Sequence, residues 1–277
     1  MTKIRYDSIT LLFLSVIICS SVLISARLGL AVPSDEINTG TITGKIMIKG
    51  GAPLAGGRVF FYDTSTGPAP FVDQFRRLPD ITGEIDADGV FSVKLPAGKY
   101  FMRAVKKISE AGTGLQNNDY VFFSLDEKGK PKEYDVKSGS ILDTGTMSGA
   151  VAYKKVEKDI GTAIEGVITD MEGKPVEGAT VFAFMDQTTT RKPLFFSERT
   201  GSDGKYILRV TEGTYYLRVR NKLGGGPPEP GQILGIFGEQ VPTAVTVKDG
   251  EIKRRTDIKV IRFRGRGPAP GVGPQKR

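Results

Sequence analysis

The chain has 277 residues and a formal net charge of +8, and its 35 glycines and 16 prolines indicate many turns. It contains no histidine, which excludes Ser-His and Cys-His catalytic pairs and imidazole metal ligands. Its single cysteine, Cys19, excludes an internal disulfide framework.

The first predicted element is an export signal over residues 1–31. Two basic residues precede the apolar run 9–24, and small residues follow it. We expect cleavage after Ala31, with cleavage after Ala26 as the alternative. An uncleaved membrane anchor is the competing interpretation, because the run is only slightly shorter than a span. Both interpretations place the rest of the chain outside the cytoplasm, as a periplasmic, cell-surface or secreted protein.

Cys19 lies inside this apolar run, and the preceding Ile18 is too large for a typical lipoprotein signal. If the signal is removed, no cysteine remains to form a disulfide in an oxidising compartment. The stability of the mature chain would then depend on packed apolar surface.

An internal repeat follows the signal. We place the two copies at 38–153 and 160–262, joined by a charged linker over 154–159. A basic Gly/Pro-rich tail over 263–277 is expected to be disordered. The matching segments are Gly44–Ile46 with Gly166–Ile168, Gly51–Phe60 with Gly173–Phe182, Asp88–Gly89 with Asp203–Gly204, Gly98–Arg103 with Gly213–Arg218, and Val136–Gly139 with Val247–Gly250.

Apolar side chains alternate with polar ones inside each copy, which indicates half-buried β-strands. Phe91, Val93 and Leu95 alternate with Ser92 and Lys94. Asp-Gly pairs and other glycines punctuate these runs where hairpins need a positive φ. A single sheet would leave its apolar face in water, so two sheets must pack together. The sequence therefore predicts an all-β protein of two consecutive seven-stranded β-sandwiches.

The order of these motifs carries a family resemblance. G-x-I, G-x-P-[LV]-x-G-x-x-V-F, D-G-x-[FY]-x-[VL] and G-x-Y-x-[ML]-R follow one another in both copies. This pattern resembles the carboxypeptidase regulatory-like domain, a prealbumin-like (transthyretin-like) sandwich close in shape to starch-binding-like and collagen-adhesin B-type modules. The resemblance implies an accessory domain without catalytic residues. Hydroxyisourate hydrolases among the transthyretin relatives depend on histidines, which this chain lacks.

Long loops between the predicted strands are the candidate binding elements, because binding residues are concentrated on loops of rigid scaffolds. The competing interpretation is that their aromatic residues cap the cores and that Tyr120–Phe123 is an edge strand. The candidate residues are Phe71, Phe75, Arg76 and Arg77 in the first copy, Arg191, Phe195 and Phe196 in the second, and Tyr120 and Phe237 beyond a further pair of loops.

Two short motifs resemble known binding sequences, a calcium loop and an RGG segment. Asp86–Gly89 is similar to the start of a calcium loop, but the strand that follows leaves no room for the remaining ligands, so a plain β-turn is favoured. Arg264–Gly267 resembles an RGG segment, although a solvated tail, or contact with acidic surface polymers, is favoured over nucleic acid in an exported protein.

The predicted function is that of an exported, non-catalytic binding or structural protein of the cell envelope, without metal or cofactor. Its expected partner is an envelope protein or a surface polysaccharide, and it would contact a membrane only through an uncleaved N-terminal segment. The alternative is a carbohydrate-binding protein with a starch-binding-like fold. An enzyme would need acid–base chemistry from Asp, Glu, Lys or Tyr alone.

Overall fold

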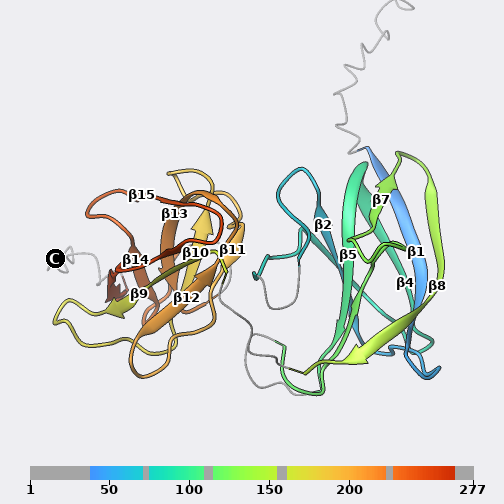
Figure 1. Ribbon diagram of the computed structural model, residues 1–277, viewed down its shortest axis with the longest axis horizontal. Coiled ribbons are helices and arrows are strands. Elements are labelled where there is room, and N and C mark those ends of the chain that lie inside the picture. The colour runs from blue at the N-terminus through green and yellow to red at the C-terminus, as the bar shows by residue number, and fades with distance from the viewer. Residues whose placement is uncertain (1–37, 71–74, 109–114, 155–160, 223–226, 266–277) are drawn as a thin grey trace, which may run out of the picture. The chain divides into compact units, whose positions relative to one another are not determined.

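The computed structural model describes residues 38–70, 75–108, 115–154, 161–222 and 227–265 (Figure 1). The predicted signal, most of the predicted linker and most of the predicted tail lie outside these residues. All regular structure in the described part is β-strand, and the strands form two consecutive sandwiches. The predicted all-β fold class is confirmed.

The strands of the first sandwich form one hydrogen-bonded path in the order β3-β2-β5-β6-β8-β1-β4, with β7 paired to β5. β8 pairs in parallel with β1 and, near its end, antiparallel with β6, so it links the two layers. The strands are β1 (Thr39–Ile48), β2 (Arg58–Asp63), β3 (Ile81–Glu84), β4 (Val90–Pro96), β5 (Gly98–Lys106), β6 (Tyr120–Phe123), β7 (Glu133–Val136) and β8 (Ile141–Ala152).

The second sandwich repeats this path as β11-β10-β13-β14-β17-β9-β12, with β15 paired to β13 and β16 to β9. Each path therefore has the seven strands expected, and the short strands β7, β15 and β16 lie beside it. The strands are β9 (Ala163–Thr169), β10 (Thr180–Phe184), β11 (Phe195–Phe196), β12 (Lys205–Arg209), β13 (Gly213–Arg220), β14 (Ile233–Ile236), β15 (Ala244–Val247), β16 (Ile252–Lys253) and β17 (Ile258–Arg262).

Each sandwich has its own core, built by the alternation seen in the sequence. Phe91, Val93 and Leu95 on β4 are buried and their neighbours are exposed. Ile42 on β1 and Ile164 on β9 occupy matching positions, and neither exposes any surface. Removing such side chains from water is the main favourable contribution to folding, at roughly 25 cal/mol per Å² of apolar surface.

The repeated Asp-Gly turns keep the same hydrogen bonds in both copies. The amide of Ile46 donates to the carbonyl of Gly89 over 2.8 Å, and the amide of Ile168 donates to that of Gly204 over 2.8 Å. Both glycines have a positive φ, 82° and 66°. A Cβ at Gly89 would lie 2.7 Å from the oxygen of Ile46, and one at Gly204 would lie 2.5 Å from that of Ile168. These positions therefore require glycine.

The G-x-Y motif fixes a hairpin through its tyrosine. The Tyr100 hydroxyl donates to the Pro96 carbonyl over 2.9 Å, and the Tyr215 hydroxyl donates to that of Thr211 over 3.0 Å. Burial raises the pKa of both tyrosines, so each hydroxyl keeps its proton at neutral pH. The bond ties the start of the strand to the residue four positions earlier in both sandwiches.

Candidate functional site

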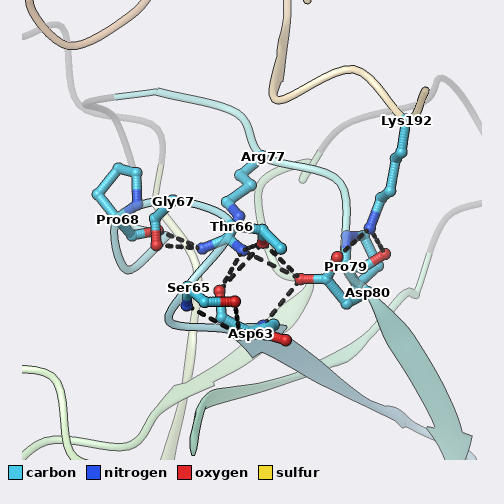
Figure 2. A network of polar contacts seen from close by, with 9 residues as sticks. All are labelled: Asp63, Ser65, Thr66, Gly67, Pro68, Arg77, Pro79, Asp80 and Lys192. Carbon is cyan, nitrogen blue, oxygen red and sulfur yellow. Dashed lines mark hydrogen bonds and ion pairs between the residues drawn. The ribbon is translucent and has the colours of Figure 1, made fainter. Parts of the chain in front are cut away.

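The loop between β2 and β3 is organised around Arg77. Its side chain is almost fully buried, with 4% of the residue exposed, and its guanidinium points into the loop (Figure 2). Five hydrogen bonds leave its two terminal nitrogens. The acceptors are the carbonyls of Gly67 (2.7 Å), Pro68 (2.6 Å) and Asp63 (2.7 Å), Asp80 Oδ2 (3.0 Å) and Thr66 Oγ1.

This network is a structural use of arginine, because the planar fork of donors satisfies several backbone carbonyls at once. Burial lowers the pKa of Arg77 from its usual value, and the neighbouring Asp80 carboxylate opposes that shift. The guanidinium also lies 5.4 Å from the centre of the Tyr62 ring. The loop is therefore fixed on the sheet by one buried cation.

The same loop contacts the segment that contains β11. Lys192 Nζ is 3.0 Å from Asp80 Oδ1 and also donates to the Pro79 carbonyl (Figure 2). The Phe196 amide donates to the Arg76 carbonyl over 3.1 Å, and Arg76 forms an ion pair with Glu198. The loop and the segment 192–198 thus share both backbone and side-chain bonds.

An aromatic contact accompanies these polar ones. The rings of Phe75 and Phe195 meet edge to face with their centres 5.0 Å apart, a favoured aromatic geometry. Phe195 is fully buried, with 0% of the residue exposed, and belongs to the core of the second sandwich. Phe75 is partly buried against that core. Phe195 is therefore a core residue, and Phe75 caps that core.

The other predicted binding residues are spread over several elements. Arg191 is exposed, whereas Phe196, Tyr120 and Phe237 are partly buried. Tyr120 lies on β6, which is placed between β5 and β8 and is not an edge strand. Phe71 lies outside the described residues. The structure brings together Phe75, Arg76, Arg77, Phe195 and Phe196. Phe237 packs against the same core as Phe75, whereas Tyr120 packs against the core of the first sandwich.

A second group, on the outer faces of the sheets, was missed by the sequence analysis. Arg103 on β5 lies 5.5 Å from the centre of the Phe60 ring, 5.7 Å from Tyr62 and 5.9 Å from Phe123. In the sequence, Arg103 stood out only as a marker of the repeat. The available signal was the run Phe60–Tyr62, in which successive residues are all aromatic, so that at least one ring must face away from the core; in the structure Phe60 and Tyr62 do so.

The hydroxyl of Tyr62 and the Nε of Arg103 are buried without a hydrogen-bond partner in the described part of the chain. Burial raises the pKa of Tyr62, while the nearby Arg103 and Arg77 lower it. A buried donor without a partner costs about 1–3 kcal/mol. The outer face of β2 and β5 therefore stores unsatisfied polar groups.

The Asp86–Gly89 segment forms the expected turn. Asp86 Oδ1 accepts hydrogen bonds from the amides of Asp88 (2.9 Å) and Val90 (2.8 Å). Within the described ranges, no three Cys, Asp or Glu side chains come close enough to hold a metal ion. No helix suited to crossing a membrane occurs in the part of the chain that the structure describes.

Comparison with known proteins gives distant structural matches. No known protein family matches the chain, and no curated protein matches it in sequence. Among solved structures, the Bacillus anthracis TIE protein matches with 14% identity and a TM-score of 0.26, over 81% of this chain and 34% of that protein. The chain thus spans about a third of that protein's length.

Two further matches cover their counterparts completely. The minor pilin GBS52 of Streptococcus agalactiae matches with 14% identity and a TM-score of 0.24, over 85% of this chain and 100% of that one. A DUF3823 family protein from Parabacteroides merdae matches with 11% identity and a TM-score of 0.22, over 78% and 100%. At these identities and scores, the matches do not assign the chain to a family.

Proposed function

We propose that this protein is an exported, non-catalytic binding or structural protein of the cell envelope, which engages a protein or a surface polymer through its sandwich loops. The observation that carries the proposal is the hydrogen bonding of buried Arg77, which ties residues 63–68 and Asp80 together at the loop between β2 and β3. A loop fixed on a rigid β-scaffold presents its exposed groups without paying to order them on binding.

The titratable groups support a non-catalytic role. Those with the clearest pKa shifts from burial are tyrosines and arginines. Tyr100 and Tyr215 close hairpins, and Arg77 closes a loop. The polar atoms of Tyr100, Tyr215 and Arg77 are engaged in maintaining the fold, whereas a catalytic acid or base must face a substrate.

The test is recovery of a partner from envelope extracts with the mature chain as bait, followed by chemical cross-linking. The double variant Arg191→Glu/Phe196→Ala changes an exposed and a partly exposed loop residue and should lose the partner. Lys94→Glu, on the exposed face of β4, is the matched control and should retain it. Equal recovery by all three proteins, or no recovery by any of them, would refute binding through the loops.

Carbohydrate binding is the second candidate, and one observation favours it. The rings of Phe182 and Phe196 are stacked, with centres 6.3 Å apart and planes 24° apart, and Phe196 lies partly exposed on the edge strand β11. Affinity gels containing neutral glucans should slow the protein, and Phe196→Ala should abolish the effect. Phe71→Ala tests the other predicted aromatic. Migration unchanged on every glucan would exclude this candidate.

A further inference from the structure

The outer faces of the two sandwiches repeat one row of side chains. In each row, strand pairing places an arginine between two apolar side chains on the neighbouring strands, and residues directly opposite one another share a face. We refer to these sets as the outer-face rows. They are Phe60–Arg103–Phe123 on β2, β5 and β6, and Phe182–Arg218–Ile236 on β10, β13 and β14.

The arginine of the first row has aromatic neighbours and no counter-ion. No carboxylate of the described residues forms an ion pair with Arg103. Of its guanidinium nitrogens, only Nε is both buried and unpaired. The two terminal nitrogens therefore remain accessible, framed by the rings of Phe60 and Phe123. They are the pair of donors that a carboxylate engages in bidentate fashion.

The second row carries two cations. Arg220 lies two residues after Arg218 on β13 and so shares its face. Burial lowers the pKa of Arg220, and the neighbouring charge of Arg218 lowers it further. Arg218 Nη1 donates to the Thr189 carbonyl over 3.3 Å, but neither arginine forms an ion pair with a carboxylate in the described ranges. Two like charges therefore share a partly buried face.

Several other arginines of the described residues have a carboxylate partner, although Arg209, whose Nε is also buried and unpaired, has none. Arg58 pairs with Glu84, Arg76 with Glu198, and the buried Arg77 with Asp80. Partly buried cations are costly without a compensating anion, and the chain supplies that anion at Arg77 and leaves it out at the two outer-face rows. Charge complementarity therefore points to an external anion at both rows.

We propose that the outer-face rows bind the carboxylates of an acidic polysaccharide, with Arg103 in one row and Arg218 and Arg220 in the other as the anion-binding groups. The rings of Phe60 and Phe123 would contact the apolar faces of the sugar units. Aromatic walls with a few placed polar groups are typical of ligand sites. This inference rests on the proposed role as a binding protein, but it uses sheet faces in place of loops.

The duplication favours a polysaccharide over an acidic peptide. Two rows of the same design on one chain suit a polymer whose anionic unit repeats. Once one row has bound the polymer, binding by the second row is intramolecular and costs less translational and rotational entropy. A peptide would need two separate acidic motifs. Neutral glycans carry no negative charge to compensate the three arginines.

The test measures the affinity of the full chain for polygalacturonate by calorimetry, with dextran as the neutral comparator and polyglutamate as the acidic peptide comparator. Arg103→Gln and Arg218→Gln should each weaken binding of polygalacturonate about tenfold, because each removes a charge-assisted bidentate contact. The double variant should show no measurable binding. Binding of the natural protein should also weaken as the salt concentration rises.

Arg254→Gln is the matched control, since it removes the same charge from an exposed arginine paired with Glu165. It should leave the affinity unchanged. Arg103→Lys keeps the charge without the planar guanidinium group. Its affinity for polygalacturonate should lie between those of the natural protein and Arg103→Gln. Circular dichroism of each variant establishes that the fold is intact.

Three results would overturn the inference: no binding of polygalacturonate, equal loss in the Arg254→Gln control, or equally strong binding of polyglutamate. If polygalacturonate is not bound while a partner is still recovered from envelope extracts, the outer-face proposal fails and the loop proposal stands. If polygalacturonate is bound and the loop variants recover the partner as well as the natural protein does, the loop proposal fails and the outer-face proposal stands.

Discussion

The two sandwiches fill the same part of their cores with different residues. On β2 of the first, Phe61 is buried and pairs across the sheet with Ile81 of β3. At the matching place in the second, β10 has the small Ala183, and its partner on β11 is Phe195. The large ring has changed strands between the copies.

Both rings meet the tyrosine of the G-x-Y motif edge to face. The centres of Phe61 and Tyr100 are 6.5 Å apart, and those of Phe195 and Tyr215 are 5.8 Å apart. The comparison shows that the duplicated fold preserves packed volume at this place more strictly than residue identity. It also explains why Phe195, which the sequence suggested as a binding residue, lies in the core.

The largest expected effect comes from removing the exchanged ring. Phe195→Ala leaves a cavity next to Ala183 and should lower the free energy of unfolding by about 3–5 kcal/mol. The double variant Ala183→Phe/Phe195→Ile recreates the first sandwich's pair and should recover most of this loss. Denaturant unfolding of the three proteins measures it. A double variant no more stable than Phe195→Ala would show that the two cores are not interchangeable.

A smaller effect is expected at the loop that distinguishes the first sandwich. Arg77→Met removes the buried cation, leaves several loop carbonyls and Asp80 without their donor, and should cost about 3 kcal/mol. Arg76→Met removes a more exposed arginine of the same loop, whose ion pair with Glu198 is solvated, and should cost under about 1 kcal/mol.

Unfolding of both variants by denaturant, with limited proteolysis of the loop, measures this difference. Arg77→Met should be cleaved between β2 and β3 much faster than Arg76→Met. Equal stability and equal cleavage would mean that the buried network does not hold the loop.

The smallest effect concerns a hydroxyl present only in the second sandwich. Tyr206 matches Phe91 of the first, and its hydroxyl donates to the Thr256 carbonyl over 2.6 Å. Burial raises the pKa of Tyr206, and Asp257 adds to the shift. Tyr206→Phe should cost about 1 kcal/mol at neutral pH through the lost hydrogen bond.

The same substitution should change the response to alkali. In the unfolded chain a tyrosine ionises near about pH 10, whereas buried Tyr206 stays neutral. Its contribution to stability is therefore complete below that pH and is lost as the pH rises above it. From about pH 8 to about pH 11, the denaturation midpoint should fall less in Tyr206→Phe than in the natural protein. An identical fall in both would show that Tyr206 is not involved.

Local pattern was enough to predict the strands and their turns. Alternation at Phe91, Val93 and Leu95 identified the buried face of β4, because side chains of a strand point to opposite faces in turn. The repeated Asp-Gly pairs marked Gly89 and Gly204, where only glycine tolerates the close carbonyl oxygen. These are properties of a few neighbouring residues, so the sequence alone determined them.

The roles of the loop and outer-face residues were decided by tertiary structure. Carbonyls from Asp63 to Pro68 converge on buried Arg77, whereas Arg103 lies beside three aromatic rings and has no counter-ion among the described residues. Whether a charged side chain is paired, buried or open depends on atoms that are distant in the chain, and a period of two along a strand carries no information about them.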